Sequence, residues 1–105
     1  MTELASVATT PKGFKVKGVL DYANAERLLA DGIACLEQHD ESTVTVDLAG
    51  LEAKAGSLAV AVMMSWLKAA VRAEVALCFE GVPGALTTIA EFSGLREALP
   101  IESSI

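Results

Sequence analysis

The residue whose position suggests chemistry most clearly is Ser57, a hydroxyl that follows a loop of small residues and precedes a long apolar segment. If Ser57 is the N-cap of a helix, its oxygen accepts a hydrogen bond from a free N–H of the first turn, a contact worth about 1 kcal/mol. The positive end of the helix dipole also suits a phosphate there. Ser57 is therefore expected either to cap the helix alone, or to cap it and also contact a partner protein or accept a phosphate.

Other groups that could support catalysis are sparse. The one histidine, His39, is expected at the end of a different element, so a Ser-His-acid arrangement around Ser57 is not predicted. The acidic residues are scattered along the chain, and neither a GxGxxG nor a GxxxxGK[ST] pattern occurs. We therefore predict that the chain is not an enzyme and uses no cofactor.

The two cysteines, Cys35 and Cys78, lie far apart in the sequence, each within an apolar stretch. Reduced, small core residues are the expectation, and a disulfide between them is the alternative. Because the chain has a single histidine and no CxxC pattern, no metal site is predicted.

Length and charge narrow the classes of partner. The 105 residues fit a single domain over 1–105, with a net charge of −6. Eight Lys and Arg without clustering argue against nucleic acid, which requires a basic footprint, and against docking on an anionic membrane. No apolar run approaches the roughly 20 residues that span a bilayer, and the N-terminus lacks a signal-peptide pattern. We predict a cytoplasmic protein without direct membrane insertion.

Hydrophobic periodicity predicts the order strand, strand, helix, strand, helix, strand, helix. The strands are expected at 1–10 (weak), 14–20, 43–48 and 75–79, and the helices at 22–38, 57–72 and 85–92. Asp21 is expected to cap the first helix, and residues 49–56 are expected to form a loop. Strand 75–79 has two apolar faces, which favours a central position. Alternation of this kind indicates an α/β fold with some parallel strand pairs.

The helix expected after Ser57 has too few polar residues for an ordinary surface helix. A helix that is apolar all round is buried or faces a partner, and a thin two-layer domain cannot bury it on every side. Met63 and Met64 point about 100° apart, so one can face the sheet and the other outward, although both could fill the core. Trp66 is either a core residue or an interface anchor. The pattern therefore predicts a protein-binding surface.

These segments resemble the STAS domain family, named for sulfate transporters and anti-sigma-factor antagonists. In that family a strand ends in Asp-Leu-Ser-Gly-Val, and Asp-Ser-x-Gly-Leu starts an apolar helix. Here the strand ends in VDLAGL and the helix begins AGSLAVAVMMSWL, so Ser57 falls on the family's Ser/Thr. The segment FEGVPGALTTIAEFSGLREALPI is similar to a STAS C-terminus. The resemblance implies a STAS-like mixed β-sheet of about four to five strands, with the helices mainly packed on one face.

Within the family, the chain looks most like the small STAS subunit of the Mla lipid-asymmetry transporter. This resemblance implies a non-catalytic, cytoplasmic accessory subunit that binds the ATPase of an ABC phospholipid transporter and is peripheral to the inner membrane through that partner. A homodimer is a further expectation. The predicted partner-binding residues are Gly56, Ser57, Leu58, Ala61, Met64 and Ser65.

The alternative is an anti-sigma-factor antagonist, in which a partner kinase phosphorylates Ser57 and the modification controls binding to an anti-sigma factor. Two positions depart from the family pattern, because Gly56 replaces the usual Asp and Ala59 replaces the usual Gly. The Asp belongs to the phosphorylation site in such antagonists, so its replacement makes the phospho-switch the weaker of the two functions.

Overall fold

The fold follows the predicted alternation of strands and helices. The structure, a computed structural model, describes residues 4–38, 42–53, 56–84 and 86. Its elements are β1 (Ser6–Thr10), β2 (Gly13–Leu20), α1 (Ala25–Gln38), β3 (Thr43–Ala53), α2 (Gly56–Arg72) and β4 (Ala76–Glu80). The predicted order is therefore confirmed up to β4. The expected third helix, apart from Leu86, lies outside the described residues, as do His39 and the C-terminal tail.

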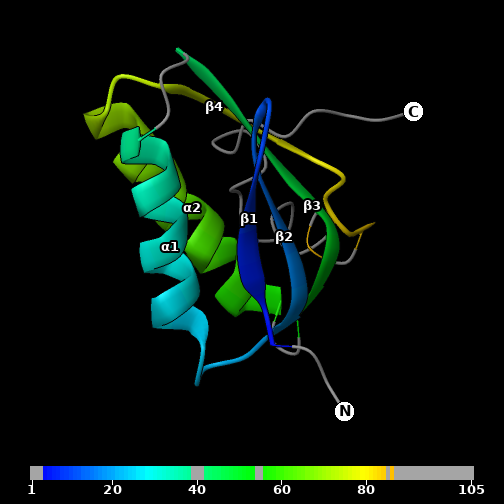
Figure 1. Cartoon of the computed structure of the whole chain (residues 1–105). Helices are drawn as coiled ribbons and strands as arrows, with labels where there is room; N and C mark the ends of the chain where they lie inside the picture. The colour runs from blue at the N-terminus through cyan, green and yellow to red at the C-terminus, as the bar shows by residue number, and fades with distance from the viewer. Residues whose placement is uncertain (1–3, 39–41, 54–55, 85, 87–105) are drawn as a thin grey trace.

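The four strands form one mixed sheet in the order β1-β2-β3-β4. β1 pairs antiparallel with β2, whereas β2–β3 and β3–β4 are parallel. Both α1 and α2 lie on the same face of this sheet (Figure 1). The predicted mixed sheet with helices on one face is thus confirmed.

The core lies between the sheet and the two helices because the strands alternate in polarity. On β2, for example, Phe14 and Val16 are buried while Lys15 and Lys17 are exposed. Burying these apolar faces stabilises the fold by about 25 cal/mol per Å2 removed from water. The other buried strand residues of this core are Leu20, Val44, Val46, Leu48, Leu51, Leu77 and Phe79.

β3 is longer than predicted, because residues 49–53 continue the strand instead of forming a loop. Beyond its pairing with β4, β3 remains paired with β2, from Gly50 opposite Lys17 to Ala53 opposite Leu20. A register shift between Lys15 and Lys17 accommodates this extension. The carboxyl ends of two parallel strands therefore lie side by side, and α1 and α2 both begin near this edge of the sheet (Figure 1).

The start of α1 differs from the prediction. Asp21 does not cap the helix; its carboxylate accepts hydrogen bonds from the N–H groups of Ala23 (2.9 Å) and Asn24 (3.1 Å) and so forms the preceding turn. The backbone carbonyl of Asn24 accepts the first helical hydrogen bond, from Leu28. The Asn24 side chain, which is buried, donates to the carbonyl of Val19 at 2.8 Å. This contact fixes the start of α1 to the end of β2.

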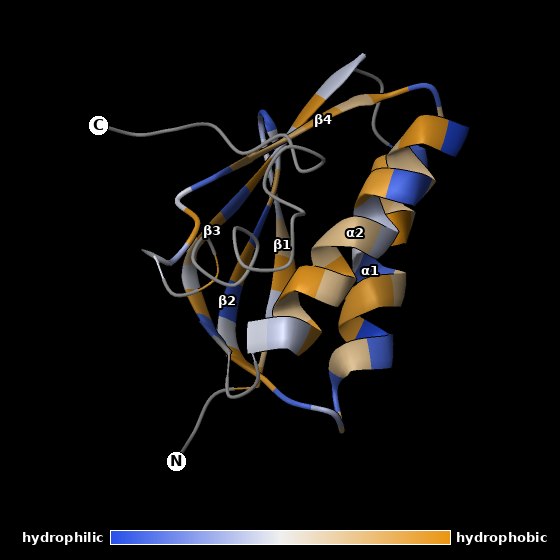
Figure 2. Cartoon of the chain, turned by 180° about the vertical axis from the view of Figure 1, so that it is seen from behind, coloured by the Kyte–Doolittle hydropathy of each residue, from blue (hydrophilic) through white to orange (hydrophobic). Residues whose placement is uncertain are grey.

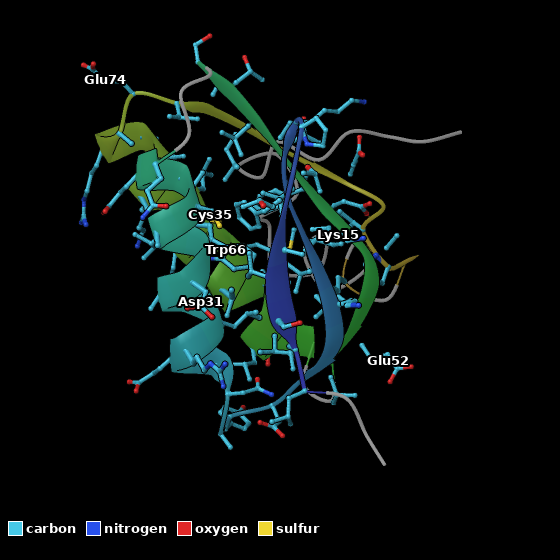
Figure 3. All side chains as sticks on the ribbon, viewed as in Figure 1. Lys15, Asp31, Cys35, Glu52, Trp66 and Glu74 are labelled. Carbon is cyan, nitrogen blue, oxygen red and sulfur yellow. The ribbon has the colours of Figure 1, made fainter. Side chains whose placement is uncertain are left out.

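The two helices are held together by Trp66, which is 1% exposed. Its indole N–H donates to the backbone carbonyl of Leu29 on α1 at 3.0 Å. The ring also packs edge-on against Phe14, with centroids 5.3 Å apart at 86°. Gly32 lets α1 approach this closely, since a Cβ there would meet the indole ring. Figure 3 shows Trp66 between α1 and the sheet.

β4 was expected in the centre of the sheet, but in the described part of the chain it is the last strand. The second face of β4 looked apolar in the sequence because it carries Ala76 and Cys78. In the structure this face is not fully buried, since Ala76 is exposed and Cys78 is half-buried. Cys35 belongs to α1 and Cys78 to β4. Among the described residues, no disulfide joins Cys35 and Cys78, and both are half-buried.

Glu74, just after the end of α2, has a left-handed backbone conformation. Its replacement tests this part of the structure. The N–H of Glu74 donates to the carbonyl of Val71 and that of Val75 to Ala70, the paired bonds of a Schellman motif. Glu74, at φ 59°, occupies the position that glycine adopts most easily. We expect Glu74→Gly to raise the free energy of unfolding by about 0.5–1 kcal/mol, after allowance for the greater freedom of the unfolded chain.

The measurement is chemical denaturation of the wild type beside Glu74→Gly and Glu74→Ala. Alanine removes the same carboxylate from the negative end of the helix dipole but keeps the Cβ. The glycine variant should therefore be the more stable of the two. An alanine variant as stable as the glycine variant would mean that charge, and not backbone strain, matters at this position.

Candidate partner-binding surface

The outward face of the first three turns of α2 consists of small and apolar residues. Ser57 and Ala61 are exposed there, and Met64 and Ser65 are half-buried. The first charged residue of the helix is Lys68, so about three turns present no charge to the solvent. Figure 2 shows the same distribution, with orange and pale residues along most of α2. The inward face holds the buried residues Ala59, Val60, Val62, Met63, Trp66 and Ala70.

Ser57 lies in the first turn of α2, where the edge of the sheet meets the helix layer. The prediction that Ser57 is the N-cap is wrong, because the helix already begins at Gly56. Its side chain is exposed, and its hydroxyl makes no hydrogen bond to any residue that the structure describes. The N–H groups of a first turn have no acceptor within the helix. A partner that approaches Ser57 can therefore meet a hydroxyl and polar backbone at the start of an apolar face.

Met63, Met64 and Trp66 of this helix divide between core and surface. Met63 is 1% exposed and faces the sheet, whereas Met64 is half-buried and lies on the outer side. Met64 follows Ser57 by seven residues, or about two turns, so both share one side of α2. Trp66 belongs to the core, and of its two predicted roles that of interface anchor is excluded by its burial.

A shallow groove of about 160 Å3 runs between α1 and α2. From α2 it is lined by Leu58, Ala61, Val62 and Ser65, three of which are among the predicted partner-binding residues. From α1 it is lined by Ala25, Glu26 and Leu29. The α1 residues were not predicted, because their spacing indicated only a helix face packed on a core. The outer surface therefore combines the face of α2 around Ser57 and Met64 with this groove.

Cys35 and Asp47 are two described residues whose side chains could support other chemistry. Burial raises the pKa of the Cys35 thiol, and the nearby Asp31 carboxylate raises it further, so this thiol is protonated at neutral pH. The Asp47 carboxylate accepts the N–H of Ala49 at 2.9 Å and so orders its own strand. The described residues contain no group of three or more His, Cys, Asp or Glu that could hold a metal ion.

A second hollow, of about 220 Å3, is lined by residues of β3, β4 and the β1–β2 turn. Its charged residues are Lys12, Asp47 and Glu80, of mixed sign. None of the predicted site residues lies there. The hollow is therefore separate from the surface around Ser57. None of the described helices is long and apolar enough to cross a membrane.

A match to a known protein family identifies the family of this domain. Residues 7–101 match the family described as Mlab, STAS domain. The chain belongs to this STAS family. The resemblance noted around Ser57 thus extends over almost the whole chain, including strands and helices far from that motif.

Two solved structures are similar to this STAS domain. The anti-sigma factor antagonist SpoIIAA in its unphosphorylated form is 13% identical, with a TM-score of 0.68, over 96% of this chain and 90% of that one. An anti-sigma factor antagonist from Mycobacterium paratuberculosis is 17% identical, with a TM-score of 0.64, over 97% of this chain and 86% of that one. At these identities the likeness shows the fold alone. A search of curated proteins gave no match.

Proposed function

We propose that this STAS domain is a non-catalytic accessory subunit that binds the ATPase subunit of an ABC phospholipid transporter. The observation that carries the proposal is the uncharged outer face of the first three turns of α2, which begins at the exposed Ser57 and includes the half-buried Met64. An apolar face of this kind is stabilised when a partner removes it from water. The family description, which names Mlab, supports the choice of partner.

The proposal treats residues 1–105 as a single domain that acts in the cytoplasm through protein contacts. It assigns the contact to Gly56, Ser57, Leu58, Ala61, Met64 and Ser65. The net charge of −6 supports a protein partner over nucleic acid or an anionic membrane surface. Any association with a membrane then comes through the transporter.

Co-purification tests this proposal. The tagged chain is expressed with an ABC ATPase subunit from the same organism and analysed by size-exclusion chromatography. We expect a stable complex that migrates ahead of either protein alone. Recovery of both proteins only as separate peaks at micromolar concentration would contradict the proposed function.

A second function, that of an anti-sigma-factor antagonist, is favoured by one observation: an exposed serine hydroxyl in a first helical turn is accessible to a kinase, and phosphate is favourable there. The glycine at position 56, which stands where such antagonists carry Asp, favours the transporter role. We therefore expect Ser57 to remain unmodified when the protein is incubated with ATP and an anti-sigma kinase. Intact mass spectrometry is the measurement, with a known antagonist as the positive control. A mass increase of one phosphate that is absent from Ser57→Ala would establish the alternative.

A further inference from the structure

The groove between α1 and α2 is apolar along its length. Leu29 and Leu58 are half-buried on its two walls, and Ala25, Ala61 and Ser65 leave room between them because their side chains are small. Val62, which is 6% exposed, closes its floor toward the core. A larger apolar side chain that entered the groove would remove both leucines from water, whereas an empty groove leaves them in contact with it.

The groove is fixed in shape by the contacts beneath it. The indole N–H of Trp66 donates to the carbonyl of Leu29, which lies in the groove wall, at 3.0 Å. Gly32 brings α1 against the same ring. Because the two helices are fixed to each other before binding, little free energy is needed to order them when an occupant binds. The groove is therefore a formed receptor surface, not a gap that must open.

The length of the groove suits a helix. On α2 it runs from Leu58 to Ser65, seven residues and about 10 Å along the axis. On α1, Ala25 and Leu29 are one turn apart. A helix laid along such a groove presents apolar side chains at i, i+3 or i+4, and i+7, which covers the same distance.

Charge limits which helix fits. Among the described residues that line the groove, Glu26 is the only charged one. The basic Arg27, also on α1, is within 4.0 Å of Asp31 on its own helix. The charge that lines the groove is therefore negative, and the exposed Lys68 follows Ser65 by three residues on α2. A second copy of this chain, with its net charge of −6, would bring like charges together.

We propose that this groove receives an amphipathic helix of the partner protein, with apolar residues at one-turn spacing and a Lys or Arg that pairs with Glu26. The inference rests on the proposed function, since Leu58, Ala61 and Ser65 belong both to the groove and to the surface around Ser57. It adds α1 to the interface and defines the chemistry of the segment that binds.

Filling the groove is the first test. Ala61→Trp places a ring in the space where the partner helix would lie, on an exposed position that does not disturb the core. Ala34→Trp is the matched control, because Ala34 is exposed and lies about 140° around α1 from Leu29. Affinity for the purified ATPase subunit is measured by biolayer interferometry, with thermal melts to confirm folding. We expect at least about a tenfold loss with Ala61→Trp and none with Ala34→Trp.

Reversing the charge at the rim is the second test. Glu26→Lys should also weaken binding, and the ratio of wild-type to variant affinity should shrink as salt rises from 50 to 500 mM, because salt screens an exposed charge pair. One outcome would overturn the groove inference and leave the proposed function intact. In that outcome the wild type binds, Ser57→Arg weakens binding, and both Ala61→Trp and Glu26→Lys bind with wild-type affinity. Absence of binding by the wild type would overturn both.

Discussion

Replacing Gly32 with alanine is expected to lower the free energy of unfolding by about 3 kcal/mol, although alanine is the better helix former by about 1 kcal/mol. The added methyl would lie against the Trp66 ring, with Cζ2 only 2.7 Å away. That ring cannot retreat, because it is 1% exposed, hydrogen-bonded to Leu29 and packed on Phe14. A loss of this size is a large part of the 5–15 kcal/mol that stabilises a typical domain. Urea denaturation followed by circular dichroism is the measurement.

Two further variants separate the steric effect from helix propensity. Ala34→Gly, on the exposed side of the same helix, measures propensity alone and should cost about 1 kcal/mol. Trp66→Phe removes the part of the ring that the new methyl would meet, so it should reduce the cost of Gly32→Ala in the double variant. If Gly32→Ala is as stable as the wild type, the close approach of α1 to Trp66 is not a feature of the folded protein.

The fold could be predicted from the sequence where the periodicity is strong. Alternation on β2 and β3 and the long apolar run of α2 fixed both the type and the order of these elements. The prediction failed where tertiary pairing overrides local propensity. Ala49 and Gly50 are residue types typical of a loop. They nevertheless extend β3, because β2 supplies hydrogen-bond partners across the register shift. Asn24 was overlooked because its role depends on a contact with Val19 on another element.

The candidate surface was predicted only in part, for a related reason. Ser57 and Met64 could be placed on one outward side of α2 from helical spacing alone. The contribution of Leu29 and Glu26 could not, since it depends on how α1 packs beside α2. Trp66 was equally open to a core or an interface role, because composition does not reveal which side of an apolar helix faces the sheet. The close contact between Gly32 and Trp66, which marks Trp66 as a core residue, exists only when α1 and α2 are packed together.

Ser57→Arg is expected to weaken binding to the ATPase subunit by about 100-fold or more, equivalent to about 2.7 kcal/mol. The arginine places a long charged side chain at the start of an otherwise uncharged face, so the interface must either bury that charge or separate. Because Ser57 is exposed, the substitution should leave the stability of the free protein within about 0.5 kcal/mol of the wild type. Loss of binding would then reflect the surface and not the fold.

Ser42→Arg is the matched control for this variant. Ser42 is also an exposed serine, and it precedes β3 whereas Ser57 follows that strand, so it lies at the opposite end of β3. Both variants add the same side chain and the same charge to the protein. Any general effect of reducing the net negative charge should therefore appear equally in both.

The most direct test of the proposed function is isothermal titration of the ABC ATPase subunit with the wild type, Ser57→Arg and Ser42→Arg under identical salt and pH. The proposed interface predicts that the wild type and Ser42→Arg bind with equal affinity and that Ser57→Arg shows a dissociation constant about 100-fold higher. Equal affinity of all three proteins would contradict the assignment of the partner surface to the N-terminal face of α2.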